Sequence, residues 1–111
     1  MKISIIGAGY VGLPLAIAFS KYYSVVCYDV SKERIDQLNK GFDINKQYSR
    51  VEIKKIKLSY TNNADSLLNT DVFIVTVPTP IDSSNHPDLS MLKKASILVG
   101  KYIKKKSTII Y

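Results

Sequence analysis

The first dozen residues constrain the fold of this chain more than any other stretch. Ile3, Ile5 and Ile6 form an apolar, β-branched run, which predicts a strand buried on both faces of a parallel sheet. A glycine-rich turn and a helical pattern follow directly. This order predicts a strand–turn–helix unit whose turn lies at the carboxyl end of the strand.

Three glycines of the turn, Gly7, Gly9 and Gly12, have the spacing G-x-G-x-x-G. At such spacing the first glycine permits the tight turn, the second lets a pyrophosphate approach the backbone, and the third lets helix pack on strand. The helix directs its unpaired N–H groups and the positive end of its dipole at that pyrophosphate. Glycine-rich turns also occur with a purely structural role, so the spacing alone leaves both interpretations open.

Asp29 favours the nucleotide interpretation. A second apolar run, residues 25–28, predicts another buried strand, and Asp29 ends it about 20 residues after the first glycine, as the dinucleotide fingerprint requires. Its carboxylate would accept hydrogen bonds from the ribose hydroxyls and repel a 2′-phosphate, so we expect NAD rather than NADP. Two alternatives remain open: Asp29 could merely end the strand, and an inward-pointing Arg34 could partly neutralise it and weaken the preference.

Periodicity and capping signals predict alternating helices and strands along the rest of the chain. Ser31 is the expected N-cap of the second helix, and Gly41 the residue just past its end. We expect helices at 11–22, 31–40, within 42–57, at 64–69 and from Asp88 or Ser90 to about 103, and strands at 24–29, 58–61, 71–77 and 107–111. In the last helix we expect four core residues, Leu89, Leu92, Ile97 and Val99.

Pro78 and Pro80 follow the strand expected at 71–77. Proline disfavours both helix and sheet ladder, so the two residues predict a rigid loop at the carboxyl end of a central strand. Ligands of doubly wound sheets bind in the crevice outside such ends, where the strand order reverses. We expect this crevice between the first and the fourth strand.

The composition disfavours several functions, of which nucleic-acid binding stays open only because of the charge. The net charge of +7 comes from 14 lysines and 2 arginines, but scarce arginine and no basic–aromatic interleaving disfavour a nucleic-acid surface. Cys27, the only cysteine, falls in a predicted buried strand, so we expect a core residue rather than a nucleophile. No stretch has the roughly 18 apolar residues of a membrane span, and no secretion signal is visible, so we expect a cytoplasmic protein without membrane contact.

The polar residues outside the glycine turn suggest no metal site and no catalytic site. We expect His86 to be a surface residue. Asp65, Asp71 and Asp82 have no nearby residues in the sequence that would complete a metal site or an acid–base pair. A chain of 111 residues is one domain, small for a unit that holds both a dinucleotide and a second substrate. Because it also stops within an expected strand, we expect a partial domain of a longer protein.

Three groups of residues together resemble the UDP-glucose/GDP-mannose dehydrogenase family over essentially the whole chain. They are Gly7-Ala8-Gly9-Tyr10-Val11-Gly12-Leu13-Pro14, then Tyr28-Asp29-Val30 with Arg34-Ile35, then Val75-Thr76-Val77-Pro78-Thr79-Pro80-Ile81-Asp82 with Pro87-Asp88-Leu89. The third group more narrowly resembles bacterial UDP-N-acetylhexosamine (GlcNAc or GalNAc) 6-dehydrogenases of capsule and surface polysaccharide biosynthesis. The resemblance implies a Rossmann-like doubly wound α/β fold with a parallel sheet in the order 3-2-1-4-5, truncated after the fifth strand.

The resemblance implies an NAD-dependent oxidation of a UDP-sugar C6 alcohol to the uronic acid, through a cysteine that Cys27 does not match. Residues 1–111 would be the NAD-binding domain, without catalytic residues and inactive alone, and the full-length enzyme a homodimer. It implies cofactor roles only: amides of the turn for the pyrophosphate, Asp29 and Arg34 for the adenosine half, and residues 76–80 for the other half. The implied residues are Gly7, Gly9, Tyr10, Val11, Gly12, Asp29, Arg34, Thr76, Val77, Pro78 and Thr79.

Three alternatives stay open. Arg34 could be an exposed helix residue, and Thr79 could be only a turn residue. The whole chain could also be a stand-alone regulatory NAD-binding module of the potassium-transport type, which shares the first strand, the glycine turn and the strand-end acid. The usual fourth-strand loop of such modules is not Pro-Thr-Pro, which disfavours this third alternative.

Overall fold

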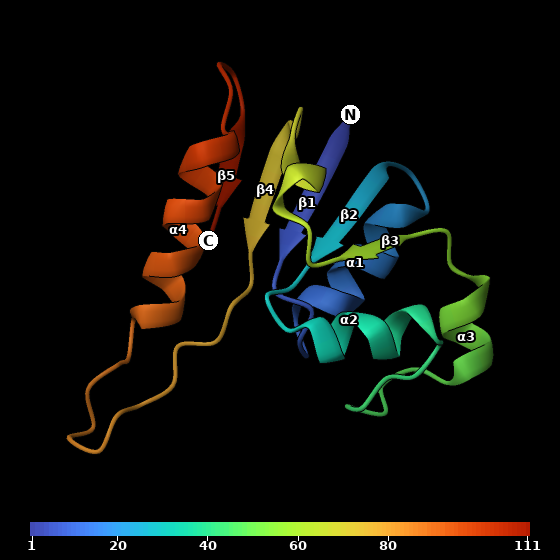
Figure 1. Cartoon of the computed structure of the whole chain (residues 1–111), viewed down its shortest axis with the longest axis horizontal. Coiled ribbons are helices and arrows are strands. Elements are labelled where there is room, and N and C mark those ends of the chain that lie inside the picture. Colours follow the sequence, from blue (N-terminus) through green and yellow to red (C-terminus); the bar gives the residue numbers. More distant parts are fainter.

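A five-stranded parallel sheet with helices on both faces forms the protein (Figure 1), whose computed structural model describes residues 1–111. The strand order is β3-β2-β1-β4-β5, which confirms the predicted doubly wound fold. The strands are β1 (Lys2–Ile6), β2 (Ser24–Tyr28), β3 (Ser59–Thr61), β4 (Val72–Val75) and β5 (Thr108–Ile110). The helices are α1 (Gly12–Ser20), α2 (Lys32–Asn39), α3 (Arg50–Lys55), the 3₁₀ helix η1 (Ala64–Leu67) and α4 (Ser90–Tyr102).

Two apolar cores lie on the opposite faces of the sheet. Ile5 of β1 packs with residues of α1 and α2 in one core, whereas its neighbour Ile6 packs with Phe73 of β4 and Val99 of α4 in the other. Neighbouring side chains of a strand point to opposite faces, so a sheet covered on both faces needs apolar residues at successive positions. This requirement explains the nearly continuous apolar runs of β1, β2 and β4.

The register of the central strands determines where the site lies. Ile6, the last residue of β1, pairs with Tyr28 of β2 on one side and with Val75 of β4 on the other. The residues that follow these three, Gly7, Asp29 and Thr76, therefore meet at one edge of the sheet. The strand order reverses between β1 and β4, so this edge is the switch point at which ligands of doubly wound sheets bind.

The predicted boundaries of α2 are confirmed by its caps. The Ser31 side chain accepts a hydrogen bond from the Arg34 N–H, and Gly41 follows the helix with a φ of +83°. The helix expected within residues 42–57 is α3, which begins with a capping box between Ser49 and Glu52. These caps position the connection between α2 and α3, which lies beside the candidate site.

Two core assignments in α4 are wrong. Leu89 and Ile97 are 43% and 64% exposed, whereas Val99 and Ala95 are buried and Leu92 is partly buried. The inward residues thus recur at intervals of three and four, and residue 97 falls off this stripe. Several predicted elements are also shorter than expected. Among them, α1 ends at Ser20, β4 covers only Val72–Val75, and the helix expected at 64–69 is a single 3₁₀ turn.

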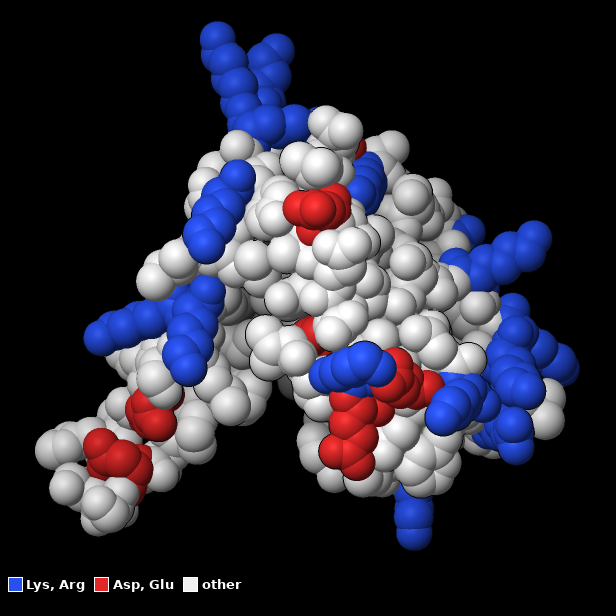
Figure 2. Space-filling view, in the orientation of Figure 1, with Lys and Arg blue, Asp and Glu red and all other residues white.

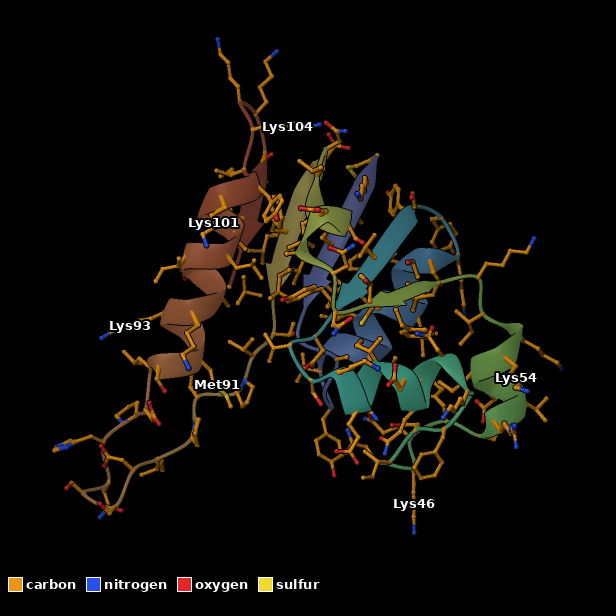
Figure 3. All side chains as sticks on the ribbon, viewed as in Figure 1. Lys46, Lys54, Met91, Lys93, Lys101 and Lys104 are labelled. Carbon is orange, nitrogen blue, oxygen red and sulfur yellow. The ribbon has the colours of Figure 1, made fainter.

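The lysines lie in separate groups around the molecule. Lys93 and Lys101 project from α4, Lys54 from α3, and Lys46 from the connection between α2 and α3, each in a different direction (Figure 3). In the view of Figure 2 the basic side chains form separate groups, with acidic side chains between them, and the projection at the lower left carries acidic side chains but no lysine or arginine. This arrangement is typical of solvated faces rather than of one basic binding surface. No helix of the chain combines the length and the apolar character that crossing a membrane requires.

Candidate functional site

The glycine-rich turn joins β1 to α1 at the switch point. Gly7 has a φ of +110°, a conformation that favours glycine, and its N–H donates to the Tyr28 carbonyl at 2.8 Å. A Cβ added to Gly12 would overlap the Gly7 carbonyl group, because the first turn of α1 lies directly against the end of β1. The backbone itself therefore requires the first and third glycines.

Gly9 differs from the other two glycines because the space beside it is open. Apart from its two chain neighbours, no residue has an atom within 4 Å of the place where its Cβ would be. The backbone N–H groups of Gly9, Tyr10, Val11 and Gly12 donate no hydrogen bond within the chain, and α1 has no side-chain cap and no acidic residue in its first turn. Four unpaired donors at the positive end of a helix, beside open space, fit the pyrophosphate of a dinucleotide.

Thr76, which follows the end of β4, forms hydrogen bonds with the start of the turn. Its N–H donates to the Ile6 carbonyl at 2.9 Å, and its hydroxyl donates to the Gly7 carbonyl at 2.9 Å. Of the residues after it, Val77 packs against the core, whereas Pro78 and Thr79 are exposed. The segment from there to α4 extends away from the sheet (Figure 1).

Asp29 connects the turn to the start of α2. Its Oδ2 accepts a hydrogen bond from the Ala8 N–H at 2.8 Å, and its Oδ1 accepts one from the Ser31 N–H at 2.9 Å. Each carboxylate oxygen can accept further hydrogen bonds. The half-buried carboxylate thus has a fixed orientation at the switch point and capacity left for ribose hydroxyls.

Arg34 is not an exposed helix residue, since only 10% of its side chain is accessible. Its Nε donates to the Ala8 carbonyl at 2.9 Å, and its Nη1 forms an ion pair with Asp43 Oδ1 at 2.9 Å. Its Nη2 is buried without a partner. Asp29 and Arg34 therefore bind the N–H and the carbonyl of the same residue of the turn, Ala8.

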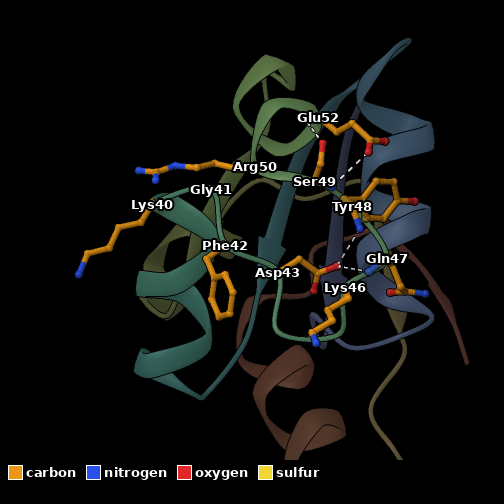
Figure 4. Close-up of a pocket in the computed structure, with 10 residues that line it drawn as sticks. All are labelled: Lys40, Gly41, Phe42, Asp43, Lys46, Gln47, Tyr48, Ser49, Arg50 and Glu52. Atoms are coloured by element: carbon orange, nitrogen blue, oxygen red, sulfur yellow. Dashed lines mark hydrogen bonds between the residues drawn. The ribbon is translucent and has the colours of Figure 1, made fainter.

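Asp43 belongs to this site, and sequence reasoning missed it. Its side chain is fully buried and accepts hydrogen bonds from Arg34 and from the Asn45 N–H. It also accepts the N–H groups of Gln47 and Tyr48 (Figure 4). Burial acts to raise the pKa of Asp43, but the hydrogen bonds from Arg34 and the backbone outweigh it and hold that pKa below its usual value. The connection between α2 and α3 is thus folded around one carboxylate.

This connection also contacts the glycine turn, because Gln47 Nε2 donates to the Tyr10 carbonyl at 3.3 Å. Its outer side forms the open hollow of Figure 4, lined by residues of the range 40–52 that include none of the predicted cofactor residues. The only sequence signal for this arrangement was an aspartate two residues after the glycine that ends α2, too weak to single out Asp43.

Cys27 lies in β2 and is completely buried, as predicted. Burial raises the pKa of its thiol to about 12. A thiol with such a pKa is not a nucleophile near neutral pH.

Comparison with known proteins identifies the family. The sequence model of the NAD binding domain of the UDP-glucose/GDP-mannose dehydrogenase family matches residues 1–111. The chain belongs to this family. This match confirms the family that the sequence motifs indicated, and it confirms NAD as the cofactor of this domain. The alternative of a regulatory module of the potassium-transport type is not favoured.

Relatives in the UDP-glucose/GDP-mannose dehydrogenase family act on several sugars. The chain is 46% identical to UDP-N-acetyl-D-glucosamine 6-dehydrogenase of Pseudomonas aeruginosa, over 100% of this chain and 26% of the relative. It is 39% identical to protein CapL of Staphylococcus aureus, over 99% of this chain and 26% of CapL. The solved structure of UDP-D-ManNAc dehydrogenase from Pyrococcus horikoshii superposes with a TM-score of 0.90 at 34% identity, over 98% of this chain and 27% of that one. The chain thus spans about a quarter of the length of these relatives.

Proposed function

We propose that residues 1–111 are the domain that binds NAD in a UDP-sugar 6-dehydrogenase, with the glycine turn as the pyrophosphate site. The four unpaired amides of residues 9–12 beside the open space at Gly9 carry this proposal. Gly7 and Gly12 shape the turn, Asp29 binds the ribose hydroxyls of the adenosine, and Arg34 supports the same half by holding the Ala8 carbonyl beside Asp29. Thr76, Val77, Pro78 and Thr79 lie on the side of the nicotinamide half, which their position after β4 supports.

The proposed reaction of a protein of the relatives' length is oxidation of the C6 alcohol of a UDP-N-acetylhexosamine, or of UDP-glucose, to the uronic acid with two NAD. The relative named UDP-N-acetyl-D-glucosamine 6-dehydrogenase supports this substrate class, and CapL supports a role in capsule synthesis. NAD supplies the hydride acceptor, and this domain binds and orients it. Cys27 is buried with a raised pKa, so the nucleophile belongs to a segment outside residues 1–111.

The first prediction is that the 111-residue chain binds NAD but turns over no nucleotide sugar. It has the turn and the ribose acid, but no residue positioned for hydride abstraction or nucleophilic attack. NADH formation is followed at 340 nm with UDP-glucose, UDP-N-acetylglucosamine and UDP-N-acetylgalactosamine in turn, while calorimetry measures NAD binding. Turnover of any of the three nucleotide sugars would mean that catalytic residues lie within these 111 positions. It would contradict the proposal that this domain only binds NAD.

The second prediction concerns Asp29→Ala, which should weaken NAD binding by about 1.5–3 kcal/mol, or roughly tenfold to 150-fold. The loss follows because the ribose hydroxyls would lose a charged acceptor, whereas Asp36→Ala removes the same charge from the exposed side of α2 and should change affinity little. Isothermal titration of both variants and of the unchanged chain, with NAD and with NADP, tests the role. Equal affinity of the unchanged chain for the two cofactors would argue against Asp29 as the selective residue.

The remaining proposals concern assembly and compartment. An apolar hollow lies beside α4 and is lined by Leu89, Leu92, Ile97 and Tyr111. A second copy of the protein or a further segment of the chain would bury this surface. This supports a homodimer for a protein of the relatives' length, which light scattering would measure. The unpaired thiol of Cys27 supports a cytoplasmic location, where thiols stay reduced.

A further inference from the structure

Arg34 occupies a position that matters for the choice between NAD and NADP. In Rossmann folds an arginine close to the strand-end acid accommodates the 2′-phosphate of NADP. Arg34 lies in the first turn of α2, five residues after Asp29. Asp29 accepts the Ala8 N–H and Arg34 donates to the Ala8 carbonyl, so both charged groups lie against the same residue of the turn.

Arg34 nevertheless forms its ion pair with Asp43 and not with Asp29. The ion pair joins Nη1 to Asp43 Oδ1 at 2.9 Å, with 10% and 0% of the two side chains exposed, and no ion pair joins Arg34 to Asp29. Three backbone N–H groups satisfy the rest of the Asp43 carboxylate. A buried pair with its other hydrogen bonds satisfied holds its geometry, whereas an exposed pair is screened by water.

We propose that Asp43 is a positioning residue that makes this site selective for NAD, by keeping the Arg34 guanidinium in a buried ion pair away from a 2′-phosphate. Asp29 then faces the ribose with its full negative charge. The inference rests on the proposed role of Asp29 in cofactor binding. Lys32, the other cation in the first turn of α2, pairs with Asp36 at 2.7 Å, but this pair is exposed and its charges are screened.

The experiment is a pair of isothermal titrations, with NAD and with NADP, on the unchanged chain and on Asp43→Asn. Loss of the Asp43 charge frees the Arg34 guanidinium for the 2′-phosphate, so the ratio of NADP to NAD affinity should rise about tenfold or more, as one charged hydrogen bond provides. Asp36→Asn is the matched control, because it adds the same charge and frees Lys32 instead. Its ratio should change by less than about threefold.

The double variant Arg34→Met/Asp43→Asn distinguishes an effect of the Arg34 charge from a general structural effect of the Asp43 substitution. Without the guanidinium, the ratio of NADP to NAD affinity should return to that of the unchanged chain. Asp43→Ser keeps an acceptor for the Asn45 N–H and should reproduce the shift if the asparagine variant is poorly folded. An unchanged ratio in both single variants, an equal shift in Asp36→Asn, or loss of the fold in both single variants would overturn the selective role. Failure of the unchanged chain to bind either cofactor would instead contradict the proposed NAD site.

Discussion

Replacing Gly9 by valine will remove measurable NAD binding while the fold stays intact. Apart from the two chain neighbours, no residue has an atom within 4 Å of the added Cβ, and Gly9 is not among the residues with positive φ, so the backbone accepts the side chain. The branched side chain would fill the space beside the four unpaired amides, from which a pyrophosphate must approach. Loss of two hydrogen bonds to a charged group, about 1.5–3 kcal/mol each, weakens binding by at least about 100-fold.

Titration calorimetry measures the loss of binding, and circular dichroism with thermal unfolding shows whether the fold is kept. Gly9→Ala is the graded control, because one methyl group obstructs the same space less and should leave part of the affinity. If the valine variant bound NAD as tightly as the unchanged chain, the glycine turn would have only a structural role. The amide site of residues 9–12 would then be wrong, whatever Asp29 contributes.

The parts of this site that the sequence predicts are those with a local cause. An apolar run that ends at a glycine or an acid predicts a buried strand and its last residue without knowledge of the fold, as for β1 and β2. Parallel pairing then brings Gly7, Asp29 and Thr76 to the same edge. The caps of α2 likewise depend on residues within four positions of the helix ends.

The parts that the sequence did not predict depend on the path of the chain in space. Asp43 lies in an irregular connection without periodicity, and its role arises only because that connection folds back beside the turn and meets Arg34. Ile97 is apolar but exposed, because α4 contacts the sheet along a single stripe. The role of Thr79, which is exposed in the loop after β4, stays a prediction.

Gly12→Ala will have the largest effect on stability. The added Cβ would overlap the Gly7 carbonyl group and approach the Thr76 hydroxyl, and backbone atoms cannot rotate away as a flexible side chain can. Overpacking of this kind costs about 1–3 kcal/mol or more, and we expect the upper end of that range. The melting temperature should fall by roughly 10–20 °C in a chain of this size.

Gly100→Ala is the matched control, because it is the same substitution within α4, where no atom beyond the backbone of the helix itself and the two chain neighbours lies within 4 Å of the added Cβ. Alanine is the better helix former there, so this variant should be more stable by about 0.4–1 kcal/mol. Thermal unfolding of the two variants should therefore shift the melting temperature in opposite directions. A Gly12→Ala chain as stable as the unchanged one would show that α1 does not lie against the end of β1. The close approach that aims the amides of residues 9–12 at a pyrophosphate would then be absent.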